Sequence, residues 1–340
     1  MQIVSSAPPK KKMLFLCIGH FGLYKIFEEG FATHGHCDVT TILYKGYFYQ
    51  YRSVWERLYN VFSKIFLGVN IKIEKTALHH FQSLSAEAHF DYLFVICPEM
   101  MHPSALDYIT AKADQSIVYY WDGFDHFPAY LDTVKYFDEH YSFDPVDAKK
   151  YGLQFITNFH FYGHDDRPVE QDFYFVGTCD RRYPEIERIA KCLSEQGQQA
   201  VFKLLIDKPE WVPAERSPFI ELIEEPVPMS EAKEHFKRSR YVLDVHKEIQ
   251  HGLSFRIFEA MGMKKKLITT NADVRNYDFY RPQNIFVWES STDRIPDEFF
   301  ATPYLDLPDE IFRKYSREHW VRTVLKLSLI HISEPTRRRG

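Results

Sequence analysis

The beginning of the sequence lacks an apolar run long enough to cross a membrane as a helix. Its first apolar run, MLFLCIG at residues 13–19, has seven residues, whereas a spanning helix needs about 20. No small-residue cleavage site follows this run, so it is not typical of an export signal. We therefore interpret it as a buried strand. We expect a cytoplasmic protein, and leave open a peripheral association with the cytoplasmic face of the inner membrane.

The sequence also lacks paired cysteines and an excess of positive charge. Its five cysteines show no C-x-x-C spacing, which argues against a disulfide framework or a zinc site and fits a reducing cytosol. Cys17 and Cys97 lie inside apolar runs and are expected to be buried small hydrophobes. The formal net charge of −5 gives no electrostatic reason to expect nucleic acid as a partner.

A dinucleotide fingerprint is missing as well. Two glycine turns, IGHFGLY (18–24) and VGTCDRR (176–182), each separate a strand-like run from a helix-like one, but neither reads G-x-G-x-x-G. A nicotinamide cofactor is therefore not predicted, and we expect no cofactor. Such turns still let the backbone approach a ligand closely and offer helix amides to a phosphate or sugar oxygen. The alternative is that these glycines serve only to form the turns between strand and helix.

Apolar runs alternate with helix-compatible segments along the whole chain. With 340 residues and 45% hydrophobic composition, two cores of ordinary size can be buried. The alternation predicts an α/β protein with two Rossmann-like domains facing across a cleft, at residues 1–165 and 166–326. Helices are expected within 46–85, over 182–197 and over 230–238. Strands are expected at 13–19, 39–44, 91–98, 116–121, 141–144, 153–159, 172–178, 200–206, 241–246, 267–270 and 285–288.

The far C-terminal residues do not read as part of this pattern. Residues 327–337 spell LSLIHISEPTR, the translation of a common transposase-based sequencing adapter. We therefore interpret 327–340 as a non-native artefact and exclude it from the fold. The alternative is a genuine amphipathic tail.

One stretch, HGLSFRIFEAMGMKKKLITTN at residues 251–271, combines an apolar pattern with polar residues at a helix start. Gly252 allows close approach of a ligand, and Ser254 is placed to cap a helix that begins near Phe255. Amides at that helix start and the charge of Arg256 suit a diphosphate. Because a carboxylate repels a diphosphate, Glu259 is better suited to accept hydrogen bonds from ribose hydroxyls.

This stretch resembles the donor-binding segment of bacterial GT-B glycosyltransferases. Those commonly carry a Glu, seven residues, a second Glu and then Ala-Met and a strand; here Glu259 matches the second Glu, and His251 replaces the first. DFYFVGTCDRRYPEIERI (172–189) is similar to the start of their nucleotide-binding domain, and residues 119–153 to the end of their acceptor-side domain. The similarity covers most of residues 13–290. It is strongest to spore-maturation-like enzymes and to those of lipopolysaccharide or capsule biosynthesis.

The resemblance implies a bacterial enzyme of the cell envelope that takes a sugar from a nucleotide-sugar donor and needs no bound metal. Helix dipole and cations would stabilise the leaving diphosphate, and the acceptor would be a surface polysaccharide or a lipid-linked saccharide. Because His251 departs from the motif, retaining stereochemistry does not follow. The predicted donor-binding residues are Gly177, Thr178, Arg182, Lys203, His251, Gly252, Leu253, Ser254, Arg256 and Glu259.

On the acceptor side, carboxylates follow predicted strands. Asp122 and Asp125 flank Gly123 in WDGFD and are candidates for the general base that accepts a proton from an acceptor hydroxyl. The alternative is a turn with capping aspartates. His20 in the first glycine turn and Glu99 after Pro98 are further candidates with less support.

Two other functions compete with sugar transfer. A sugar-nucleotide epimerase with the same fold would need additional catalytic carboxylates in the cleft. A non-catalytic two-domain sugar-binding protein would be expected to carry an export signal, and would leave the arrangement from Gly252 to Glu259 without a purpose.

Overall fold

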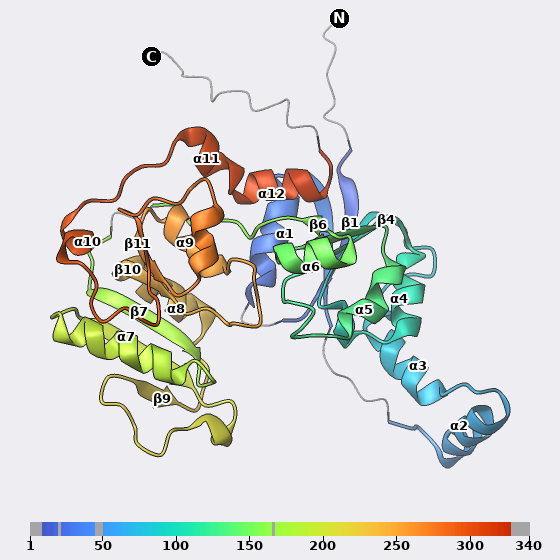
Figure 1. Ribbon diagram of the computed structural model, residues 1–340. Helices are drawn as coiled ribbons and strands as arrows, with labels where there is room; N and C mark the ends of the chain where they lie inside the picture. The colour runs from blue at the N-terminus through green and yellow to red at the C-terminus, as the bar shows by residue number, and fades with distance from the viewer. Residues whose placement is uncertain (1–8, 20–21, 45–49, 165–166, 328–340) are drawn as a thin grey trace, which may run out of the picture. The chain divides into compact units, whose positions relative to one another are not determined.

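A computed structural model describes residues 9–19, 22–44, 50–164 and 167–327 (Figure 1). The chain divides into two compact units, one of Met1–Ile156 with Val321–Gly340 and one of Thr157–Trp320. Each unit contains one six-stranded sheet, so the prediction of two Rossmann-like domains is confirmed. Residues 165 and 166, at the predicted domain boundary, and residues 328–340 of the predicted adapter segment lie outside the described ranges.

The sheet of the first unit has the strand order β2-β1-β3-β4-β5-β6, with every neighbouring pair parallel. Its central strands are continuous apolar runs because both faces of a parallel sheet are covered; Leu14, Phe15 and Leu16 are fully buried. The order reverses between β1 and β3. The strands are β1 (Lys11–Cys17), β2 (Cys37–Leu43), β3 (Phe90–Ile96), β4 (Ala113–Tyr120), β5 (Glu139–Ser142) and β6 (Gln154–Phe155).

Among the residues that the structure describes, six α-helices belong wholly to the first unit. Phe27 and Phe31 of the first helix pack on Phe15 and cover one face of the sheet. Asp144 caps the sixth, accepting hydrogen bonds from Val146 N (2.9 Å) and Asp147 N (3.2 Å), since an N-cap carboxylate satisfies first-turn amides. The helices are α1 (Tyr24–Thr33), α2 (Val54–Phe66), α3 (Ile71–Leu78), α4 (Pro103–Thr110), α5 (Tyr130–Thr133) and α6 (Pro145–Tyr151).

The sheet of the second unit has the order β12-β11-β10-β7-β8-β9, again all parallel. Numbered from β7 as the first strand, this is the 3-2-1-4-5-6 order of dinucleotide-binding Rossmann domains. Its switch point lies between β7 and β10. The strands are β7 (Gln171–Thr178), β8 (Ala200–Leu205), β9 (Glu221–Ile223), β10 (Ser239–Asp244), β11 (Lys266–Thr269) and β12 (Ile285–Val287).

Helices cover both faces of the second sheet (Figure 1). Ile186 and Ile189 of α7 join a core cluster with Phe173 and Phe202, while Ile257 and Phe258 of α9 join a second cluster with Tyr174. The helices predicted over 182–197 and 230–238 are confirmed as α7 and α8. The helices are α7 (Tyr183–Glu195), α8 (Met229–Arg238), α9 (Phe255–Gly262), α10 (Asp297–Ala301), α11 (Asp309–Lys314) and α12 (Arg317–Val324), which continues across the division between the units.

None of the helices within the described ranges has both the length and the hydropathy needed to cross a bilayer.

One expectation about the strands was wrong, and one strand was not predicted. The strand expected over 153–159 is limited to Gln154–Phe155, because the chain beyond it serves the second unit: Asn158 donates a hydrogen bond from Nδ2 to the carbonyl of Leu253 at 2.9 Å. Strand β9 was not predicted, because three residues that are exposed or half-buried carry no periodic signal.

Gly262, in the last turn of α9, marks a close approach between this helix and the segment that enters the second unit. A Cβ atom built on it would lie 2.3 Å from the carbonyl oxygen of Tyr162 and 2.8 Å from Cβ of His160. The backbone oxygen cannot move aside alone, because it belongs to a packed segment. Only glycine therefore allows α9 to be seated at this depth.

We expect Gly262→Ala to lower the free energy of unfolding by about 1–3 kcal/mol, because the overpacking outweighs the higher helix propensity of alanine. Urea unfolding followed by circular dichroism measures the change. Gly163→Ala is the matched control, since nothing lies within 4 Å of its Cβ position. Equal stability of the two variants would show that the approach at Gly262 is not tight.

Candidate functional site

The carboxyl ends of β7 and β10 form the centre of the candidate donor site. In an open parallel sheet the loops diverge at the switch point and leave room for a ligand beyond the strand ends. Gly177 and Thr178 end β7, and Asp244 ends β10. Gly177 is half-buried, and a Cβ there would lie 3.2 Å from the ring of Phe175.

Asp244 is a buried carboxylate, with 5% of its surface exposed. Ser254 donates a hydrogen bond from Oγ to its Oδ1 at 2.6 Å, and Thr269 donates from Oγ1 to its Oδ2 at 2.8 Å. Its carbonyl accepts from Thr270 N at 3.1 Å. A buried charge is tolerated only when it is hydrogen-bonded, so these contacts bind the ends of β10 and β11 to the start of α9.

A second set of polar contacts fixes the loop between β10 and α9. Asn271 lies with Nδ2 3.2 Å from Nδ1 of His246 and 3.5 Å from the carbonyl oxygen of Gly252. His246 N donates to Oγ1 of Thr270 at 2.7 Å. Burial lowers the pKa of His246, which favours the neutral imidazole. The backbone around Gly252 is thus held in place, with Gly252 buried and His251 half-buried.

Ser254 stands at the predicted place but makes a different contact. It is the N-cap residue of a helix that begins at Phe255, as expected, yet its side chain makes no capping hydrogen bond to the helix amides. The expectation that its hydroxyl caps α9 is therefore wrong. The physical reason is the orientation of the side chain: its Oγ is turned to Oδ1 of Asp244 and makes no contact with the amides of the first turn.

Arg256 and Glu259 lie one turn apart on α9. The guanidinium of Arg256 lies over the rings of Phe236 (4.8 Å) and Phe175 (5.3 Å), with both terminal nitrogens 3.4 Å from the carbonyl oxygen of Val176. Burial lowers its pKa, and the charge of Glu259 opposes this. The arginine thus reaches the end of β7.

Burial raises the pKa of Glu259, while Arg256 acts in the opposite direction. Among the residues that the structure describes, none donates a hydrogen bond to its carboxylate, so its acceptor capacity is unused.

The other two predicted cations are engaged by acids. Arg182, at the N-cap of α7, bonds Asp180 through Nε (2.9 Å) and a terminal nitrogen (2.8 Å), and donates to the carbonyl of Val245 at 2.7 Å. Burial would raise the pKa of Asp180, but Arg182 outweighs it and lowers that pKa. Lys203 lies within β8 and pairs with Glu221 at 3.7 Å.

Leu253 contributes its backbone to this region and its side chain to the core. The residue is 2% exposed, and its carbonyl accepts the hydrogen bond from Asn158 described above. Leu253 is therefore nearly inaccessible as a whole residue, and its carbonyl is already bonded within the unit.

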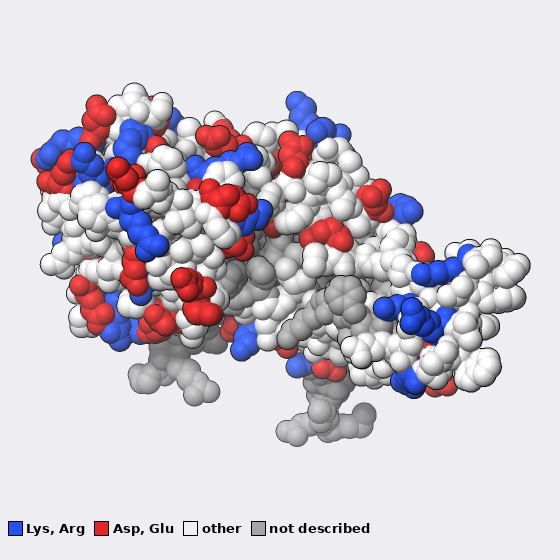
Figure 2. Space-filling model, turned by 90° about the horizontal axis from the view of Figure 1, so that it is seen from below, with Lys and Arg blue, Asp and Glu red and all other residues white. Residues whose placement is uncertain are grey.

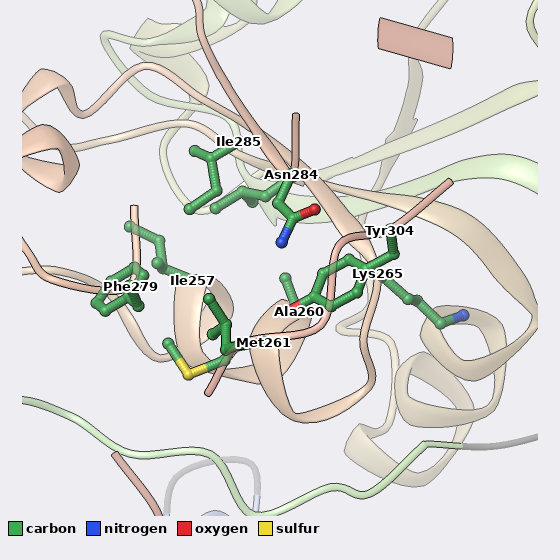
Figure 3. A pocket seen from close by; sticks show the side chains of 10 residues that line it. Ile257, Ala260, Met261, Lys265, Phe279, Asn284, Ile285 and Tyr304 are labelled. Carbon is green, nitrogen blue, oxygen red and sulfur yellow. The ribbon is translucent and has the colours of Figure 1, made fainter. Parts of the chain in front are cut away.

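The inner face of α9 borders a small pocket, shown in Figure 3. Its walls are mainly apolar. The side-chain amide of Asn284 donates to the carbonyl of Leu305 and accepts from its N–H, both at 2.8 Å. We therefore assign this pocket to the core of the unit. Its lining residues are Ile257, Ala260, Met261, Lys265, Leu267, Phe279, Asn284, Ile285, Tyr304 and Leu307.

In the first unit, Asp122 and Asp125 follow β4 in different environments. Asp122 is half-buried. Asp125 is exposed and lies 3.8 Å from Nζ of Lys150, a surface ion pair of small energetic value. His20 lies outside the described residues. Within the described ranges, no group of three His, Cys, Asp or Glu side chains is placed to hold a metal ion.

Glu99 was the weaker candidate in the sequence and has the more unusual environment. It follows β3 after Cys97, which adopts a left-handed conformation at φ 59°, a strain found at functional sites. Its Oε2 atom is buried and finds no hydrogen-bond partner among the described residues. Burial raises the pKa of Glu99 to about 7, and the charge of Asp122 adds to the effect. Its charge also raises the pKa of the Tyr130 phenol, though burial of that phenol contributes more.

Comparisons with known proteins show the fold. No protein-family model matches the sequence, and no curated protein does. AviGT4, a glycosyltransferase involved in avilamycin A biosynthesis, aligns with a TM-score of 0.57 and 13% identity over 93% of this chain and 96% of its own. A UDP-N-acetylglucosamine 2-epimerase aligns with a TM-score of 0.52 and 12% identity over 97% and 99%. The chain therefore has the GT-B fold, as predicted.

We expect the stability of the protein to fall as pH rises because of Glu99. Its carboxyl ionises near 4.5 when unfolded and near 7 when folded. Between these values the folded state holds the extra proton, so the free energy of unfolding decreases with rising pH and levels off above 7, by at most about 3 kcal/mol. Urea unfolding at pH 5 to 8 should show this loss in the wild type but not in Glu99→Gln.

Exposed Glu87→Gln, the control, should behave like the wild type. A loss of equal size in Glu99→Gln would contradict the assignment.

Proposed function

We propose that the protein is a glycosyltransferase that moves a sugar from a nucleotide-sugar donor to a surface polysaccharide or a lipid-linked saccharide. The second unit holds the donor, and the first unit supplies the base for the acceptor. The GT-B fold supports a reaction of this class, although folds host several functions. The donor site and its chemistry therefore have to be argued from the residues themselves.

The observation that carries this proposal is the start of α9 at the switch point of the second sheet. The hydroxyl of Ser254 is turned away to Asp244, so the side chain that normally caps a helix leaves the positive end of its dipole to a ligand. A diphosphate fits that position. One turn on, Glu259 has unused acceptor capacity for the vicinal hydroxyls of a ribose. Gly177 and Thr178 border the diphosphate from β7.

The charges favour Arg256 as the cation that meets the leaving diphosphate. Arg182 and Lys203 are already paired with Asp180 and Glu221. In this proposal the amides and dipole of α9 provide most of the stabilisation and Arg256 adds charge, so transfer needs neither a metal nor a cofactor.

On the acceptor side, Asp122 and Glu99 are the candidate bases. The base removes the proton of an acceptor hydroxyl as its oxygen attacks the anomeric carbon, and the bond from that carbon to the diphosphate breaks. A general base works best with a pKa near the working pH. The pKa of Glu99 near 7 meets this requirement, so we add Glu99 to the predicted Asp122.

We expect one nucleotide among UDP, GDP, dTDP and CMP, or its sugar, to raise the thermal unfolding temperature of the wild type, because a ligand stabilises the state that binds it. Glu259→Gln should lose most of that shift through its weaker ribose contact. Glu310→Gln, an exposed acid on α11, is the control and should keep the full shift. An equal shift in Glu259→Gln, or no shift with any nucleotide, would reject this donor site.

We expect the rate of transfer to rise with pH through about 7 if Glu99 is the base, following its ionisation. Glu99→Gln should then lose at least about 100-fold in kcat, since general base catalysis contributes on this order, and should keep the nucleotide-induced thermal shift. The same loss in Asp122→Asn instead would assign the base to Asp122. Full turnover in both variants would exclude both residues.

Epimerisation of a nucleotide sugar is the second candidate, since a 2-epimerase shares the fold at a TM-score of 0.52. It requires no acceptor. Incubation of the stabilising nucleotide sugar alone, followed by NMR of the sugar ring, separates the functions: an epimer indicates epimerase activity. Product formed only with an added saccharide indicates transfer, and no conversion in either case indicates a binding protein.

A further inference from the structure

Helix α2 of the first unit has its polarity reversed relative to an ordinary surface helix. A surface helix turns its apolar stripe to the core and its polar residues to water. In α2 the buried residues are Asn60 and Ser63, each 1% exposed, whereas Trp55 is 80% exposed and Ile65 69% exposed. The apolar face of this helix thus points away from the unit.

Polar contacts on the inner face hold α2 in this orientation. Asn60 donates from Nδ2 to the Tyr51 hydroxyl at 2.7 Å and accepts from Lys72 N, at the start of α3, at 3.2 Å. Glu56 accepts from Arg52 N at 2.7 Å and pairs with Lys75 of α3. Rolling the helix to bury its apolar side would break these bonds and leave buried polar groups unpaired.

The exposed apolar surface is continuous and concentrated. Of the seventeen large hydrophobic side chains that are exposed within the described ranges, ten lie between Val54 and Ile73. Because each residue turns a helix by about 100°, the apolar members of α2 cover an arc of roughly 160°. Such a patch marks an interaction surface rather than scattered exposure. The exposed members on α2 are Val54, Trp55, Leu58, Tyr59, Val61, Phe62, Ile65 and Phe66.

The charge around this face is positive in a negative chain. Residues 50–78 contain five Lys and Arg against two Glu, a balance of +3, whereas the whole chain carries −5. Arg57 and Lys64, one heptad apart, border one edge of the apolar arc, and Trp55 and Tyr59 border the other. Figure 2 shows the pale surface and the blue side chains together at the right-hand end of the view, where Figure 1 places α2.

These features select one class of partner. An apolar face with Trp and Tyr at its edge and basic residues beside it is the pattern of a helix that lies in a bilayer interface. Anionic headgroups attract the basic residues. A second copy of the chain fits less well, because it would bring a second set of like charges to the same face.

We propose that α2 docks the protein onto an anionic lipid surface, with its apolar face inserted at the boundary between headgroups and acyl chains and Arg57 and Lys64 on the phosphates. This surface is independent of the donor site. Docking through α2 would bring an acceptor-side unit to lipid-borne substrates. The docking itself does not depend on whether the protein transfers sugar.

The test is flotation of the full chain with vesicles of phosphatidylcholine alone or mixed with phosphatidylglycerol. We expect binding to the mixed vesicles, weakened by salt. Ile65→Ser with Phe66→Ser should weaken it by roughly 100-fold, because each side chain loses the transfer of a large apolar group. Arg57→Gln with Lys64→Gln should weaken it roughly 30-fold and remove the preference for anionic lipid.

Leu131→Ser with Val146→Ser is the control, since both side chains are exposed apolar groups, at 48% and 47%, that lie outside α2, and should bind like the wild type. Trp55 provides a second readout: its fluorescence should shift to the blue with mixed vesicles, and Trp55→Phe should lose the shift. No binding to mixed vesicles, or equal binding of the Ile65→Ser, Phe66→Ser variant, would overturn the proposal. So would a dimer in solution that this variant abolishes without any vesicle binding.

Discussion

The buried carboxylate of Asp244 is the constraint on which the second unit depends. It lies at the switch point of the sheet, and a charge with 5% of its surface exposed must be compensated by donors. Thr269 and Ser254 provide them, so the ends of two strands and the start of α9 share one set of hydrogen bonds. Because the hydroxyl of Ser254 is turned to this carboxylate, it does not cap its own helix. A structural need at the strand end thereby produces the uncapped helix start that the proposed donor site uses.

In the first unit, too, polar groups that need hydrogen-bond partners determine how a helix is oriented. Asn60 and Glu56 find hydrogen-bond partners on the inner side of α2, so the polar groups decide its orientation and the apolar residues are left facing water. Exposing apolar surface to water costs free energy, and an apolar partner that covers this surface would remove that cost. The exposed apolar face of α2 and the carboxylates of Asp122 and Glu99 belong to the same unit, so the proposed lipid surface and the proposed base would serve the same acceptor.

The sequence allowed most of the fold to be predicted, because strands buried on both faces are continuous apolar runs, as in residues 13–19 and 172–178. It could not predict which face of α2 points inward, since the helical period is the same in either orientation. It placed Ser254 at the right position, but the carboxylate to which the hydroxyl turns is ten residues away in sequence and is adjacent only in the fold. Glu99 was visible as an acid after a strand, yet its raised pKa depends on burial by residues from other elements.

The balance of charge in the donor site bears on how a diphosphate would be stabilised there. Arg182 is balanced by Asp180, and Arg256 lies in the field of Glu259, so the charges of these two arginines are partly compensated. In the proposed site, the oriented dipole of α9 would therefore contribute to the stabilisation of a diphosphate beside these cations. Dipoles fixed by the fold need no reorganisation when charge develops on the leaving group. This makes the rigidity provided by Asp244 and by the close seating of α9 at Gly262 part of the proposed chemistry as well as of the stability of the unit.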